Sequence, residues 1–81
     1  MIASARDAMS TTHEFVAIIL YATTNGEERT HLAHRFHAAS NTDATNAAKD
    51  WARSRLTRSE KMWLQVMRDG VPIANLGQEA I

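Results

Sequence analysis

The sequence predicts an α+β domain of the order ββαββ, with a four-stranded antiparallel sheet and one helix on one face of that sheet. Two dipeptides that favour tight hairpins, Asn25-Gly26 and Asp69-Gly70, each lie between apolar stretches. Between these dipeptides, alanines and a tryptophan recur at the spacing of a helix. Two hairpins joined by a helix give the predicted order of elements.

The first hairpin is expected to join a strand over about residues 14–23 to a strand over about residues 28–38. Residues 1–12 show no periodic pattern and are predicted to form a flexible tail, which leaves residues 13–81 as a single domain. A two-residue loop at Asn25-Gly26 fixes the register of the hairpin. Six cross-strand pairs follow, the first three on the expected core side: Phe15–Phe36, Ala17–His34, Ile19–Leu32, Val16–Arg35, Ile18–Ala33 and Leu20–His31.

The helix is expected to begin after Ser40, which can cap its N-terminus, and Asp43 then lies in the positively polarised first turn. The apolar stripe of this helix continues to about Leu56. Its members are Ala44, Ala47, Ala48, Trp51 and Ala52.

The second hairpin is expected to join strands over about residues 61–68 and 71–76. A two-residue loop at Asp69-Gly70 sets its register. Five pairs follow, the last two facing the core: Trp63–Leu76, Gln65–Ala74, Met67–Pro72, Val66–Ile73 and Leu64–Asn75.

The first strand is apolar on both of its faces, as are strands that are covered on both faces. A strand order of 2-1-3-4 places it centrally, with the helix crossing over its Phe15 side in the right-handed sense. The opposite side is left open and is predicted to meet a second copy or a different protein. The predicted interface residues are Val16, Ile18, Leu20, Trp63, Met67 and Leu76. The alternative is that the N-terminal segment, with Ile2 and Met9 as anchors, folds over this side.

Histidines at positions 31, 34 and 37 suggest a metal site as an alternative function. In a strand, His31 and His37 share a face but lie about 20 Å apart, and His34 points the other way, so the three cannot bind one ion. If residues 27–39 instead form a helix, His31 and His34 lie on neighbouring turns and can share a metal. No HExxH motif supports that alternative, and no cofactor is expected.

The net charge is zero, but basic residues gather between positions 49 and 61. A second alternative is therefore a nucleic-acid-binding domain in which Trp63 stacks on a base beside this basic stretch. The simpler interpretation is that these cations offset the dipole at the C-terminal end of a helix. The basic residues are Lys49, Arg53, Arg55, Arg58 and Lys61.

Composition and motifs narrow the functional classes. There is no cysteine, which excludes disulfides and thiolate metal sites. The longest apolar run, residues 15–22, is far shorter than the roughly 20 residues that span a bilayer, so we expect a cytoplasmic protein without membrane contact. The sequence contains no GxSxG, phosphate-loop or dinucleotide motif. A Glu14 and His37 pair across the first hairpin can move a proton in principle, but such pairs usually only solvate a sheet, so we expect no enzyme.

The segments RFHAASNTDATNAAKDWARS, residues 35–54, and LQVMRDGVPIANL, residues 64–76, resemble small single-domain ββαββ proteins of proteobacterial and phage-encoded families. Some anti-CRISPR proteins are built on a comparable scale. The resemblance consists of turn and capping patterns over about residues 14–76, and it implies a stoichiometric blocker that binds an effector complex or its nucleic-acid channel without chemistry. No functional residue is carried over from it.

The function expected from the sequence is that of a non-enzymatic, homodimeric binding protein that inhibits or regulates a protein partner. The open apolar side of the sheet is expected to mediate association. Charged residues at its rim and along the helix are expected to recognise the partner: Arg29, Arg35, Arg53, Arg55, Arg58 and Lys61.

Overall fold

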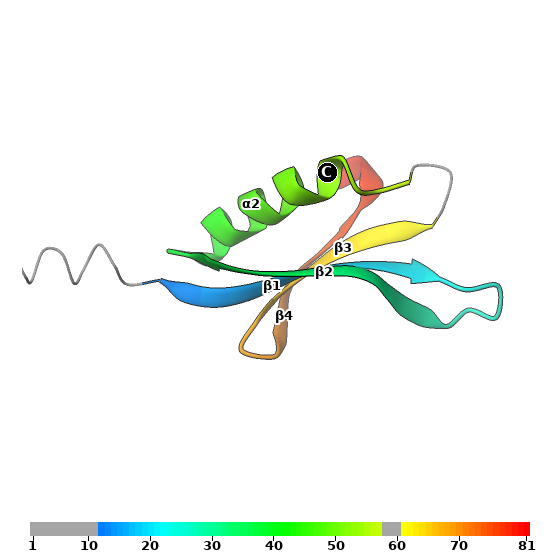
Figure 1. Ribbon diagram of the computed structural model, residues 1–81, viewed down its shortest axis with the longest axis horizontal. Helices are drawn as coiled ribbons and strands as arrows, with labels where there is room; N and C mark the ends of the chain where they lie inside the picture. The colour runs from blue at the N-terminus through cyan, green and yellow to red at the C-terminus, as the bar shows by residue number, and fades with distance from the viewer. Residues whose placement is uncertain (1–11, 58–60) are drawn as a thin grey trace, which may run out of the picture.

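The computed structural model describes residues 12–57 and 61–81. Within these residues the elements are, in order, β1 (His13–Ala22), β2 (Glu28–Ala38), α2 (Asn41–Arg53), β3 (Met62–Arg68), β4 (Val71–Gly77) and the short 3-10 helix η1 (Gln78–Ala80) (Figure 1). The strands form an antiparallel sheet of order β2-β1-β3-β4. The predicted fold class and strand order are confirmed. The predicted tail over residues 1–12 lies, apart from Thr12, outside the described residues.

The first hairpin confirms a strand over residues 28–38, so the helical alternative for this segment is wrong. Its loop has three residues, 24–26, and not the predicted two. The Thr23 N–H closes this loop by donating to the Glu27 carbonyl at 2.8 Å, and Gly26 has a φ of 84°. A β-bulge at His31 then offsets the extra loop residue. The predicted pairs from Phe15–Phe36 to Ile19–Leu32 are therefore confirmed, while Leu20 pairs with Thr30 and not with His31.

The second hairpin has the predicted two-residue turn, in which Asp69 and Gly70 both have positive φ, at 53° and 78°. Met67 pairs with Pro72 as expected. A bulge at Ile73, next to a proline that has no N–H to donate, then shifts the register by one residue. The other predicted pairs are therefore wrong, and those observed are Trp63–Gly77, Leu64–Leu76, Gln65–Asn75 and Val66–Ala74.

Helix α2 begins after Ser40, whose Oγ accepts a hydrogen bond from the Asp43 N–H at 3.1 Å, as the cap pattern predicts. Its buried face consists of Ala44, Ala48 and Ala52, spaced four residues apart. The helix ends at Arg53, before the predicted Leu56. Of the helices formed by residues 12–57 and 61–81, none combines the length and apolar character that a membrane crossing needs.

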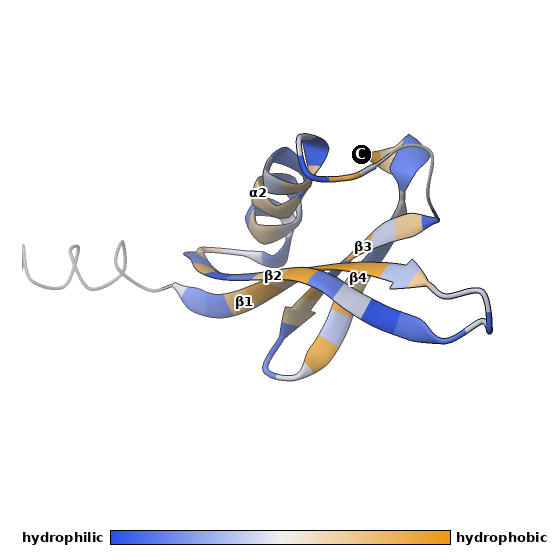
Figure 2. Ribbon diagram, turned by 45° about the vertical axis from the view of Figure 1, so that its right-hand side comes forward, coloured by the Kyte–Doolittle hydropathy of each residue, from blue (hydrophilic) through white to orange (hydrophobic). Residues whose placement is uncertain are grey.

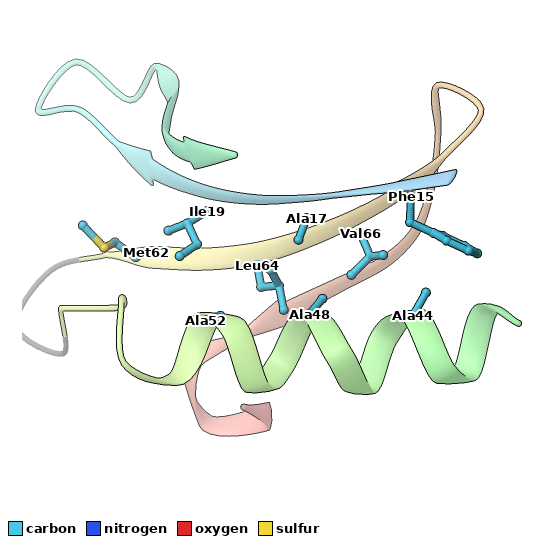
Figure 3. Packing of buried hydrophobic residues seen from close by; sticks show 9 residues of the cluster. All are labelled: Phe15, Ala17, Ile19, Ala44, Ala48, Ala52, Met62, Leu64 and Val66. Atoms are coloured by element: carbon cyan, nitrogen blue, oxygen red, sulfur yellow. The ribbon is translucent and has the colours of Figure 1, made fainter. Parts of the chain in front are cut away.

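The core lies between α2 and the sheet, and β1 and β3 supply its large side chains (Figure 3). Phe15, Ile19, Leu64 and Val66 are fully buried. The small side chains of α2 let its backbone approach the sheet closely, so the volume of the core comes from the strands. Loss of a strand side chain should therefore leave a cavity that alanines on the helix cannot fill.

We expect Leu64→Ala to lower the free energy of unfolding by about 2–5 kcal/mol, because it leaves a cavity in the closed core. Leu32→Ala is the matched control, since Leu32 also lies on a strand but is 37% exposed, and it should cost under about 1 kcal/mol. Urea unfolding followed by circular dichroism measures both. Similar losses for the two variants would contradict the assignment of the core.

Candidate protein-binding face

The open face is the side of the sheet opposite α2. In Figure 1 the helix lies on one side of the strands, and the hydropathy colouring of Figure 2 shows that β1 is strongly apolar. Phe15, Ala17 and Ile19 of β1 point into the core and are fully buried. The alternating residues of the same strand point to the open face, over which residues 12–57 and 61–81 place no other element.

Three cross-strand rows make up the open face. Each row is named by its residue on β1 and runs from β2 through β1 and β3 to β4. The Val16 row contains Arg35, Val16, Met67 and Pro72; the Ile18 row contains Ala33, Ile18, Gln65 and Asn75; the Leu20 row contains Thr30, Leu20, Trp63 and Gly77.

The structure brings together five of the six predicted interface residues. Each of these five side chains is half-buried, and they are Val16, Ile18, Leu20, Trp63 and Met67. The sixth, Leu76, was placed on this face by a wrong register. It pairs with the buried Leu64 and packs against the core, so it lies on the helix side of the sheet. The shift puts Asn75 on the open face instead, which the turn residues alone do not reveal.

Charged residues lie at both ends of the open face. Beyond the Val16 row, Glu14 pairs across the strands with His37, and its carboxylate lies 3.6 Å from the Arg35 guanidinium. Beyond the Leu20 row, Glu28 pairs with Ala22 at the other end of the same hairpin. The sequence suggested the Glu14 carboxylate as a proton carrier, and in the structure this carboxylate forms an ion pair with Arg35. This face therefore combines apolar side chains on β1 and β3 with charged residues at its two ends, and protein interfaces likewise have a polar rim.

The predicted recognition residues do not form one patch. Arg35 belongs to the open face, whereas Arg53 and Arg55 lie at the end of α2 on the opposite side of the sheet. Arg53 pairs with Asp50 and donates from Nε to the Ile81 carbonyl at 3.2 Å. Arg29 pairs with Glu27 at 3.2 Å, and Arg58 lies outside the described residues.

The nucleic-acid alternative needs Trp63 beside the basic residues of the stretch from Arg53 to Lys61. The sheet lies between Trp63 and the arginines at the end of α2, because Trp63 points to the open face while Arg55 packs over the ring of Trp51, with Cζ 5.4 Å from the ring centroid. Arg55 also donates to the Trp51 carbonyl at 2.7 Å. Of the predicted cations that the structure describes, Arg53 and Arg55 are therefore separated from the stacking ring by the sheet, and only Lys61, two residues before Trp63, lies near it.

Two of the predicted metal-ligand histidines contact rings. His34 stacks between Phe36 and Trp51, with centroid distances of 5.6 and 5.4 Å. His31, at the bulge, meets the edge of Tyr21 at 6.3 Å. In the part of the chain that the structure describes, no three His, Cys, Asp or Glu side chains are grouped as ligands of one ion. His34 therefore packs β2 against α2, whereas His31 contacts β1.

Comparison of the chain with models of protein families, with curated proteins and with solved structures gave no match. The resemblance to small ββαββ proteins consequently stays a prediction from turn and capping patterns. The function has to be inferred from the residues of the open face and its rim.

We expect Trp51→Ala to lower the free energy of unfolding by about 2–3 kcal/mol, somewhat less than for a fully buried tryptophan, because the ring is half-buried. Its loss removes the stack on His34 that joins α2 to the edge strand β2. Lys49→Ala, on the same helix but outside the stack, is the control and should change stability by less than about 0.5 kcal/mol. Thermal and urea unfolding measure both variants. An equal effect of the two substitutions would show that the stack adds nothing.

Proposed function

We propose that the chain is a non-enzymatic binding protein that forms a homodimer through its open face and regulates or inhibits a protein partner. The observation that carries this proposal is that β1 has apolar side chains on both of its faces. Its inward side chains are fully buried under α2, and its outward ones, Val16, Ile18 and Leu20, have no covering element among the described residues. Exposed apolar patches with polar rims mark interaction surfaces.

The free energy available from the open face is adequate for association. Apolar surface removed from water contributes about 25 cal/mol per Å². Burial of a few hundred Å² on each copy therefore contributes several kcal/mol before the entropic cost of association is subtracted. An 81-residue chain gains proportionally more from such burial than a large domain does, because its own core is small.

A dimer joined at the open faces leaves the two helices on its outer surfaces. Arg53 and Arg55 at the end of α2, and Arg29 on the helix side of β2, then remain available for a partner. A protein of this kind acts by occupying a surface of its target. A blocker of a nucleic-acid-binding effector complex, like the anti-CRISPR proteins that it resembles, is the most concrete form of this proposal.

Ile18→Asp tests the proposal, because it places a charge in the centre of the open face. We expect the dimer dissociation constant to rise at least about 100-fold, which corresponds to about 2.7 kcal/mol. Size-exclusion chromatography with light scattering over a range of concentrations measures the dimer, and circular dichroism verifies the fold. Ile18→Thr keeps a β-branched side chain and provides a milder second variant if the aspartate prevents folding.

Val71→Asp is the matched control. Val71 is a β-branched strand residue that is 59% exposed and, as the partner of Arg68, lies on the helix side of the sheet. It should leave the dissociation constant unchanged. A wild-type protein that stays monomeric at all concentrations, or a folded Ile18→Asp variant that dimerises normally, would overturn the proposal.

Tryptophan fluorescence offers an independent test, because the chain has two tryptophans and one of them lies on the open face. In Trp51→Phe the remaining Trp63 should emit at shorter wavelength and resist acrylamide quenching as the protein is concentrated from about 1 μM to about 100 μM, a span that brackets a micromolar dissociation constant. Adding Ile18→Asp to this variant should remove the change. An identical Trp63 spectrum at both concentrations would argue against burial of this face.

A further inference from the structure

We infer that the open face binds a second copy of this chain about a two-fold axis that runs across the strands, along the Ile18 row. This inference rests on the proposed function and adds to it the orientation of the two copies. In this arrangement each strand lies over the same strand of the second copy and runs in the opposite direction. The Val16 row of one copy then covers the Leu20 row of the other.

The charges at the two ends of β2 on the open face are complementary under this axis. One end carries Glu14 on β1 and Arg35 on β2. The other end carries Glu28, opposite Ala22, and Lys61, whose carbonyl accepts from the Ala22 N–H at 3.3 Å. The axis sets the end of β2 that carries Arg35 over the end that carries Glu28 in the second copy, with Arg35 over Thr30, one row from Glu28. It sets Glu14 over Ala22, which has Glu28 on one side and Lys61 on the other. Opposite charges therefore approach each other along β2, while Glu14 meets one charge of each sign.

Two amides in the middle of the face also favour this axis. Gln65 and Asn75 lie in the Ile18 row, and within the described part of the chain neither side chain is bonded to another group. A primary amide carries both donors and an acceptor, so an identical amide satisfies it. The axis along the Ile18 row sets each amide against its own copy. An apolar partner surface would instead leave both amides buried without hydrogen bonds.

A two-fold axis parallel to the strands, between β1 and β3, suits the same face less well. It would place β1 over β3 of the second copy, so that Gln65 would lie against the aliphatic Ile18. It would also bring Glu14, at the start of β1, toward Asp69 of the second copy, which directly follows β3. Like charges at close range disfavour that orientation.

The size of the face fits a dimer that dissociates on dilution. Four strands span about 20 Å, and β1 from Glu14 to Ala22 spans about 27 Å, which gives a flat footprint of about 500 Å². Specific interfaces bury at least about 600 Å² of accessible surface on each partner, and the relief of the side chains makes accessible surface larger than the flat footprint. The open face is therefore close to the lower limit for a specific dimer.

Single cysteines on β1 test the orientation, because the natural chain contains no cysteine. Ile18→Cys lies on the proposed axis, so two copies should be joined efficiently by a short bis-maleimide. Val16→Cys should give at least about ten-fold less product, because its two copies are separated by about 14 Å along the strands in addition to the gap between the sheets. A mixture of Val16→Cys and Leu20→Cys should again cross-link, because these rows cover one another.

The controls separate failure of the orientation from failure of the proposed function. Light scattering on each variant before cross-linking establishes that the dimer is present, and Gln65→Cys provides a second position in the Ile18 row. Cross-linking of Val16→Cys as efficient as that of Ile18→Cys in a verified dimer would overturn the axis and leave association at the open face intact. A dimer in which no open-face cysteine cross-links, or a monomer at every concentration, would overturn both.

Discussion

The structure depends on the position of β1, a strand with apolar side chains on both faces that lies between β2 and β3. A sheet is one layer thick, so covering both sides of a central strand requires two further layers. Helix α2 provides one of them and buries Phe15, Ala17 and Ile19 completely. The other side keeps Ile18 and Leu20 half-buried among their neighbours in the sheet. This unequal covering of β1 is the reason why the open face, with its charged ends and its amides, is proposed as an interface.

The composition of α2 follows from the same constraint. A helix whose buried residues are all alanines lies close to the sheet and contributes little volume to the core itself. Its lateral attachment therefore comes from Trp51, which reaches past the alanine stripe and stacks on His34 of the edge strand. The stack continues through Phe36 to the buried Phe15 and thereby joins the surface of the helix to the centre of the sheet. His34, one of the histidines whose spacing suggested a metal site, belongs to this packing.

Most of the fold could be predicted from local signals, because each one has a single physical cause. Ser40 caps the helix, Asp69-Gly70 adopts the positive φ angles of a tight turn, and alternation along β1 assigns its two faces. The two bulges could not be predicted, because residues 28–31 are all polar and residues 71–74 are all apolar, so neither segment has an alternating pattern that an extra residue would shift. In the first hairpin a longer loop and the bulge at His31 cancel, so most predicted pairs were right. In the second hairpin no change in loop length compensates for the bulge at Ile73, and Leu76 was therefore assigned to the wrong face.

The two bulges also affect the free edges of the sheet. β2 is interrupted at His31, and β4 contains Pro72 followed by its own irregularity, so neither edge offers an uninterrupted ladder of backbone donors and acceptors. Sideways addition of strands, the route by which exposed sheets grow into filaments, is thereby disfavoured. Contact between two equivalent faces about a two-fold axis uses up the complementary surface of both molecules. An assembly of this kind closes at two copies, whatever the protein concentration.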